Sequence, residues 1–112
     1  MRLHESLGQA ESTLTEILGI PGSVVLEVGA SWCGYCRNLA PVLATLMASQ
    51  PDVRHFKVED AAGQPLGRFF QVKLWPTLVF LRDGKVVARY VRPVAEEIQA
   101  GLSALKNPRI EP

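Results

Sequence analysis

The feature that most constrains this chain is an apolar run that leads directly into two cysteines and then into a helical pattern. Residues 23–30 read SVVLEVGA, which has the length and β-branched composition of a strand buried in a parallel sheet. Residues 31–36 follow as SWCGYC and contain both cysteines, Cys33 and Cys36. Apolar residues then recur at helical spacing, which predicts a helix over about 33–50. The cysteine pair is therefore predicted at a strand-to-helix junction.

The rest of the chain alternates helical and strand patterns. The spacing predicts a helix over 12–20, a strand over 53–59, a short helix within 61–72, strands over 76–81 and 86–91 around a turn at 82–85, a closing helix over 94–105, and a polar tail over 106–112. A strand, a crossover helix and a second strand form a right-handed βαβ unit. We therefore expect an α/β fold in which a central mixed β-sheet is flanked by helices on both faces.

Two segments of the chain are harder to interpret. In residues 1–11, Leu3, Leu7 and Ala10 have helical spacing, but Gly8 interrupts it. Within the predicted helix over 33–50, Pro41 predicts a kink, because proline cannot donate the helical hydrogen bond.

Length and composition limit the class of protein. A chain of 112 residues suits one domain, so residues 1–112 are expected to form a single domain. The formal net charge is +1 and no basic stripe is present, which argues against a nucleic-acid partner. The start, MRLHESLGQAEST, has no apolar run of a signal peptide, and no stretch approaches the ~20 apolar residues of a membrane span. The expected location is cytoplasmic; if a leader has been removed, it is periplasmic or secreted instead.

The spacing of the two cysteines suits a redox pair. Two cysteines are too few for a disulfide scaffold. Backbone N–H groups and the dipole at a helix N-terminus stabilise a thiolate, which is the attacking species in disulfide exchange. Cys33, the outer member, is therefore the expected nucleophile, and Cys36, one turn deeper, the residue that resolves the mixed disulfide.

Other uses of this motif fit less well. A zinc site needs four ligands, and only His4 and His55 remain, at no recognised spacing. Attachment of a c-type haem needs histidine after the second cysteine, where this chain has Arg37. We expect no metal and no cofactor, and we interpret His55 as a strand residue without a chemical role.

Glu27 stands inside the apolar run, where a carboxylate is costly to bury. In one interpretation it lies at the edge of the sheet and points into water, or forms a plain ion pair with Lys57. In the other it is a desolvated carboxylate beneath Cys36 that takes the thiol proton during exchange. Lys57, in the paired strand, would then tune that carboxylate.

Aromatic residues gather around the motif. Trp75 precedes Pro76 and could simply cap the core. Alternatively Trp32, Tyr35 and Trp75 form a partly exposed aromatic surface near one thiol, which suits a peptide-binding groove. We favour the groove.

In combination these motifs resemble thioredoxin over roughly residues 12–105. The resemblance rests on WCGYC at 32–36, Pro41 midway along the following helix, WPT at 75–77 and RDGK at 82–85. It implies the thioredoxin fold, a thiol–disulfide oxidoreductase activity, and a cis proline at Pro76 that faces the cysteines.

The sequence also departs from the family pattern. Tyr35 stands where thioredoxins have proline, Glu27 where they have aspartate, Gly29 where they have an aromatic residue, Trp75 where they have an aliphatic residue, and Arg92 where they have a glycine of the substrate groove.

The expected function is exchange between the Cys33–Cys36 dithiol and disulfides of protein substrates, as a thioredoxin-like reductant. The groove is expected to comprise Trp32, Gly34, Tyr35, Trp75 and Pro76, and electrons would come from a reductase or another thiol donor. We expect a monomer. The alternatives are an exported oxidase or isomerase-like protein, and a binding module with the same fold and no catalysis.

Overall fold

The computed structural model describes residues 4–7, 11–60 and 65–106. Along the chain its elements are β1 (His4–Leu7), α1 (Glu11–Leu18), β2 (Ser23–Gly29), α2 (Gly34–Met47), β3 (Arg54–Glu59), α3 (Pro65–Phe69), β4 (Thr77–Arg82), β5 (Lys85–Val91) and α4 (Ala95–Lys106). From α1 onward, the predicted order is confirmed, with boundaries shifted by a few residues. Pro41 lies inside α2, and the kink there stays a prediction.

The strands form one mixed sheet in the order β1-β3-β2-β4-β5. β1, β3 and β2 run parallel to one another, while β2–β4 and β4–β5 are antiparallel pairs. The predicted mixed sheet is therefore confirmed. β2 lies at its centre, as its apolar sequence requires.

The first strand was not predicted. Leu7 ends β1, whose backbone pairs with β3 from His4 opposite His55 to Leu7 opposite Val58. Its four residues carry no clear alternation, so the strand depends on the free edge that β3 offers rather than on a local pattern. Leu3, Gly8, Ala10 and residues 107–112 of the predicted tail lie outside the described residues.

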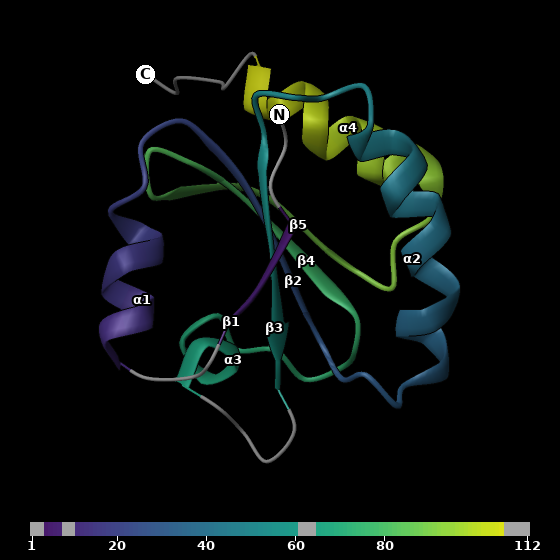
Figure 1. Ribbon diagram of the computed structural model, residues 1–112, viewed down its shortest axis with the longest axis horizontal. Helices are drawn as coiled ribbons and strands as arrows, with labels where there is room; N and C mark the ends of the chain where they lie inside the picture. The colour runs from purple at the N-terminus through teal and green to yellow at the C-terminus, as the bar shows by residue number, and fades with distance from the viewer. Residues whose placement is uncertain (1–3, 8–10, 61–64, 107–112) are drawn as a thin grey trace.

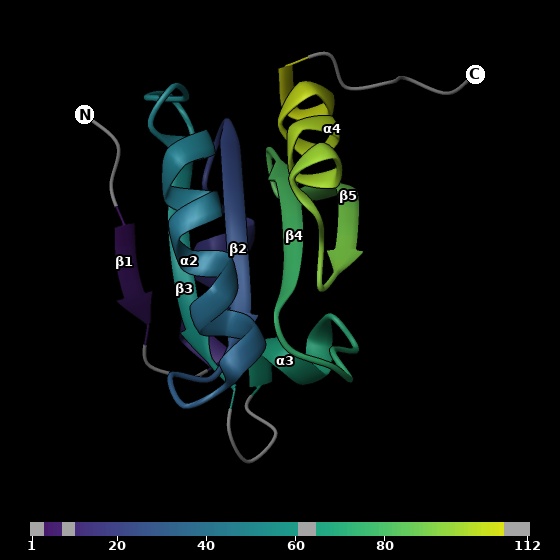
Figure 2. The ribbon, with the colours of Figure 1, turned by 90° about the vertical axis from the view of Figure 1, so that its right-hand side faces the viewer.

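Helices cover both faces of the sheet, as predicted: α1 and α3 lie on one side and α2 and α4 on the other (Figures 1 and 2). Alternate residues of β2 point to the two faces of the sheet and pack in the core on each side. Val24, Leu26 and Val28 face the α1 and α3 side, and Val25 belongs to the core under α2 and α4. By the same alternation, Glu27 faces α2.

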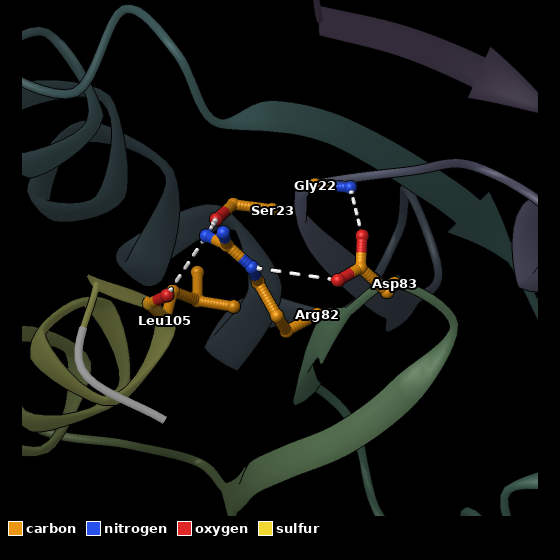
Figure 3. Close-up of polar contacts among 5 residues, drawn as sticks. All are labelled: Gly22, Ser23, Arg82, Asp83 and Leu105. Carbon is orange, nitrogen blue, oxygen red and sulfur yellow. Dashed lines mark hydrogen bonds and ion pairs between the residues drawn. The ribbon is translucent and has the colours of Figure 1, made fainter. Parts of the chain in front are cut away.

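The end of the sheet away from the cysteines is anchored by the predicted hairpin turn (Figure 3). Asp83 and Gly84 have φ values of 51° and 79°, the left-handed conformation that a two-residue hairpin requires. The Asp83 carboxylate accepts the Gly22 N–H at 2.7 Å. Arg82 donates to the Ser23 hydroxyl at 3.3 Å and the Leu105 carbonyl at 3.2 Å. These contacts join the turn to the start of β2 and the end of α4.

Candidate active site

Cys33 is the N-cap residue of α2, where β2 passes into the helix. Its backbone is extended, with φ −78° and ψ 125°, and its Sγ accepts the N–H of Cys36 at 3.3 Å. The Cys33 N–H donates to the Ala30 carbonyl at 3.1 Å, a hydrogen bond that spans the turn between β2 and α2. Cys33 is 8% exposed and Cys36 2% exposed. Both thiols are therefore buried, and Cys36 lies deeper than Cys33, which is the order that the sequence predicted.

The surroundings of the two thiols move their pKa values in opposite directions. Burial alone would raise the pKa of Cys33. Hydrogen bonds from the Cys36 side chain and N–H and from the Tyr35 N–H, together with the charge of Arg92, outweigh burial and lower this pKa. Burial, the hydrogen bond with Cys33 and the negative charge of Glu27 raise the pKa of Cys36 to about 11. Near neutral pH the outer sulfur is the better nucleophile and the inner one keeps its proton.

Gly29 provides the space that the inner thiol occupies. A Cβ atom on Gly29 would lie 2.6 Å from the Cys36 Sγ, so a side chain at this position would displace the thiol or the helix turn that carries it. The departure from the family pattern at Gly29 thus has a packing consequence at the site.

Glu27 is buried in the central strand, only 3% exposed, so its interpretation as a residue at the sheet edge is wrong. Its Oε1 lies 2.9 Å from Nε2 of His55, which is also buried. Lys57 is the register partner of Glu27 on β3. In the described part of the chain, however, the carboxylate pairs with His55, and no ion pair joins it to Lys57.

Sequence reasoning therefore missed the partner of Glu27. His55 lies in the predicted strand. The sequence analysis gave it no chemical role, but its ring contacts the Glu27 carboxylate. The signal was the two-residue alternation of β3, which puts His55 and Lys57 on one face. Which of the two residues contacts Glu27 depends on the register of β2 and β3 and on how far each side chain extends.

Trp75 connects the groove to the cysteines. The Trp75–Pro76 peptide bond is cis, as the resemblance implied. The Trp75 carbonyl oxygen lies 4.0 Å from the Cys33 Sγ. The indole N–H donates to the Asp60 carboxylate at 2.9 Å, and the ring meets Trp32 edge-on with centroids 5.2 Å apart.

Trp75 packs at the edge of the core, as the first interpretation expected, and the peptide-binding groove stays a prediction. Its ring packs against Ala30 and the two cysteines, which covers this part of the core. It also contacts Trp32, which precedes Cys33 and is 64% exposed. Asp60, which sequence reasoning missed, fixes the indole from beneath.

On the other side of Cys33 a pocket of about 320 Å³ opens between the start of α2 and the segment after β5. Its lining includes Tyr35, Leu39, Val42, Pro76, Arg92 and Val94. The Arg92 guanidinium stacks on the Tyr35 ring at 3.9 Å, and its Nε donates to the Trp75 carbonyl at 2.8 Å. The sequence marked Arg92 as a departure from the family pattern but assigned it no contact.

The described residues contain no group of three or more His, Cys, Asp or Glu side chains arranged to hold a metal ion. None of the helices formed by these residues has the length and apolar character needed to span a membrane.

Comparison with known proteins gives one consistent family. The family model described as Thioredoxin matches residues 9–104. Thioredoxin H-type 1 of Nicotiana tabacum is 41% identical over 76 residues, 68% of this chain and 60% of that protein. A Thioredoxin H-type of Ricinus communis is 36% identical over 78 residues, 70% of this chain and 66% of that protein. These matches thus span less than two thirds of either relative.

A solved structure covers more of the chain. Thioredoxin 2 from Pseudomonas aeruginosa PAO1, in its reduced form, superposes with a TM-score of 0.74 at 45% identity. The match covers 86% of this chain and 90% of the other. This chain therefore shares its architecture, a central sheet between two helical layers, with the reduced form of that thioredoxin.

Proposed function

Since this chain belongs to the thioredoxin family, we propose that it is a thiol–disulfide oxidoreductase that reduces disulfide bonds of protein substrates. The observation that carries the proposal is the pair of thiols at the start of α2. The pKa of Cys33 is lowered, and the pKa of the more deeply buried Cys36 is raised to about 11. One sulfur is thus prepared to attack, while the other is held back until a mixed disulfide has formed.

The proposed reaction has two exchange steps. The Cys33 thiolate attacks one sulfur of the substrate disulfide, and the substrate S–S bond breaks as the Cys33–substrate bond forms. The first substrate sulfur leaves as a thiolate. Cys36 then loses its proton and attacks the Cys33 Sγ, which releases the second substrate thiolate and leaves a Cys33–Cys36 disulfide. Two electrons pass to the substrate, and the two released thiolates take up protons.

The second step needs a base, because Cys36 is protonated at neutral pH. We assign this role to Glu27, whose charge raises the pKa of Cys36 and whose carboxylate is held by His55 at 2.9 Å. Lys57, opposite Glu27 in the register, is proposed to tune the carboxylate through its charge.

The substrate chain is proposed to lie across Trp32, Gly34, Tyr35, Trp75 and Pro76. The support is geometric: Trp32 and Tyr35 are 64% and 59% exposed on either side of the nucleophile. The Trp75 carbonyl next to the Cys33 Sγ offers an acceptor to a backbone N–H of an extended substrate.

The catalytic cycle must return to the dithiol. The proposal therefore includes a second protein partner, a reductase or another thiol donor, that reduces the Cys33–Cys36 disulfide. Net reduction requires a compartment with reduced thiols, so we propose a cytoplasmic location and a monomer that presents the site to large partners. Subcellular fractionation and the mass measured by light scattering test these two points.

Insulin reduction by dithiothreitol tests the activity. Wild-type protein is expected to accelerate the turbidity of precipitating B chains, while Cys33→Ser gives the uncatalysed rate. A binding module with incidental cysteines would give the uncatalysed rate in both cases.

Trapping tests the roles of the two cysteines. Affinity capture with Cys36→Ser is expected to retain partners as mixed disulfides that dithiothreitol releases. If Cys33→Ser retains them instead, the two roles are reversed.

A further inference from the structure

We infer that Arg92 makes this site selective for protein disulfides that carry an acidic side chain within one or two residues of the attacked cysteine. The inference rests on the proposed disulfide reductase function and names the substrate class that the site prefers.

The first argument is that Arg92 is held in place before any substrate binds. Its backbone N–H donates to the Pro76 carbonyl at 2.8 Å, and its Nε donates to the Trp75 carbonyl at 2.8 Å. Its guanidinium lies 3.9 Å above the Tyr35 ring centroid. A guanidinium fixed by its stem loses little conformational entropy when it binds a carboxylate.

The second argument is that no carboxylate in the described part of the chain neutralises the charge of Arg92. Arg92 is exposed, and no carboxylate of the described residues lies within ion-pair distance of it. Two nearby acidic groups have other partners: Asp60 accepts from the Trp75 indole and Glu97 from the Val94 N–H. Glu96, in the first turn of α4, forms no ion pair with Arg92. Among the described residues no acceptor is found for the terminal guanidinium nitrogens, which therefore suit an anion from outside.

The third argument is distance. The Arg92 Nε and the Cys33 Sγ lie 2.8 Å and 4.0 Å from the same Trp75 carbonyl oxygen, so the guanidinium is close to the attacking sulfur. Its charge also helps to lower the pKa of Cys33. An extended chain advances ~3.3 Å per residue. A carboxylate that reaches Arg92 while the substrate sulfur reaches Cys33 must therefore come from a residue close to the substrate cysteine.

The adjoining pocket supports the same occupant. Leu39, Val42 and Val94 give it an apolar lining, with Arg92 at its rim. An extended substrate segment with an apolar side chain in the pocket and a carboxylate on Arg92 complements both the shape and the charge of this surface.

The test uses peptides whose single cysteine is joined through a disulfide to thionitrobenzoate. Attack on the peptide sulfur releases the coloured thiolate, so single-turnover second-order rate constants can be measured with reduced protein. Three otherwise identical peptides carry Glu, Gln or Lys beside the cysteine, and a second set carries them on its other side.

In at least one set, wild type is expected to react about two- to fivefold faster with the Glu peptide than with the Gln peptide, the upper range for a solvent-exposed ion pair. The Lys peptide is expected to be slowest. Arg92→Gln should bring the ratio close to one. Lys85→Gln removes the same charge from an exposed position at the far end of β5 and should keep the wild-type ratio.

The ratio between peptides is the decisive measurement, because a change in the Cys33 pKa alters all peptide rates together. Equal rates with Glu and Gln peptides in both sets for wild type, or an unchanged Glu preference in Arg92→Gln, would overturn the inference and leave the reductase function standing. If reduced wild type cleaves none of the peptides and also fails with insulin, the proposed function itself is wrong and the inference falls with it.

Discussion

Glu27 Oε1 and His55 Nε2 lie 2.9 Å apart on adjacent strands, with both side chains buried on the face of the sheet that α2 covers. The charge of Glu27 also contributes to the raised pKa of Cys36, so the pair acts on the inner thiol. A buried carboxylate is costly unless it is paired, and His55 provides the partner.

The first prediction concerns proton transfer by Glu27. Glu27→Gln keeps the size and the contact with His55 but removes the charge, so release of the product from the mixed disulfide is expected to slow at neutral pH. Attack by Cys33 should be almost unaffected. Stopped-flow measurement of the two steps across pH 6–9 separates them. Asp52→Asn, an exposed carboxylate in the turn before β3, is the control and should leave both steps unchanged. Equal resolution rates in Glu27→Gln and wild type would assign Glu27 a structural role.

The second prediction concerns stability. His55→Leu leaves the Glu27 carboxylate buried without this partner, and the free energy of unfolding is expected to fall by about 1–3 kcal/mol. Replacing both residues, as Glu27→Leu and His55→Leu together, removes the unpaired charge and should recover much of that loss. Urea denaturation of the reduced proteins measures both changes. A double variant less stable than His55→Leu alone would contradict the pairing argument.

The third prediction follows from the coupling between the two thiols. The Cys36 side chain is one of the donors that lower the Cys33 pKa, so Cys36→Ala should raise it toward the ordinary value of 9.0. Conversely, Cys33→Ala should lower the Cys36 pKa from about 11, because it removes a hydrogen bond and a negative charge. Thiolate absorbance at 240 nm as a function of pH measures both. Unchanged values in the single-thiol variants would mean that the two sulfurs titrate independently.

The same shifts fix the sign of the pH dependence of stability. The Cys36 pKa is higher in the folded reduced protein than the ordinary 9.0, so its contribution to stability is complete below pH 9 and is lost as the pH rises toward about 11. The lowered Cys33 pKa acts in the opposite direction, and its contribution is lost as the pH falls through that pKa. Reduced wild type should therefore lose stability relative to Cys36→Ala between pH 9 and 11, which denaturation at a series of pH values can measure.

The fourth prediction concerns the redox potential. The Tyr35 N–H helps to lower the Cys33 pKa, and proline at this position has no N–H to donate. One hydrogen bond contributes ~1 kcal/mol, which corresponds to about 20 mV for a two-electron couple. Tyr35→Pro should therefore be more reducing than wild type by about that amount, and wild type less reducing than the ~−270 mV of thioredoxin.

Equilibration with glutathione measures these potentials. Tyr35→Ala is the matched control, because it removes the ring beneath Arg92 but keeps the N–H, and its potential should stay closer to that of wild type than to that of Tyr35→Pro. A wild-type potential at or below that of Tyr35→Pro would overturn the argument. A potential far above that of thioredoxin would favour the oxidase or isomerase alternative.

The sequence predicted the parts of the site that depend on neighbouring residues. The position of Cys33 at a strand-to-helix junction follows from the pattern of residues 23–47, and the structure has it at the N-cap of α2. The partner of Glu27 and the contacts of Arg92 depend instead on strand register and on contacts between residues far apart in the sequence. Nothing local in the sequence distinguishes His55 from Lys57, or brings Arg92 to Tyr35.

Arg92 also links the chemistry of the site to the completion of the fold. The N-cap position of Cys33 and the N–H groups of Tyr35 and Cys36 lie within one turn of helix, whereas Arg92 follows β5 and reaches the site through Trp75 and Tyr35. Until β5 pairs with β4, the cysteine motif lacks that positive charge, and its outer thiol is less acidic. In a chain whose last strand has yet to pair, we therefore expect a smaller thiolate fraction at Cys33 than in the finished protein.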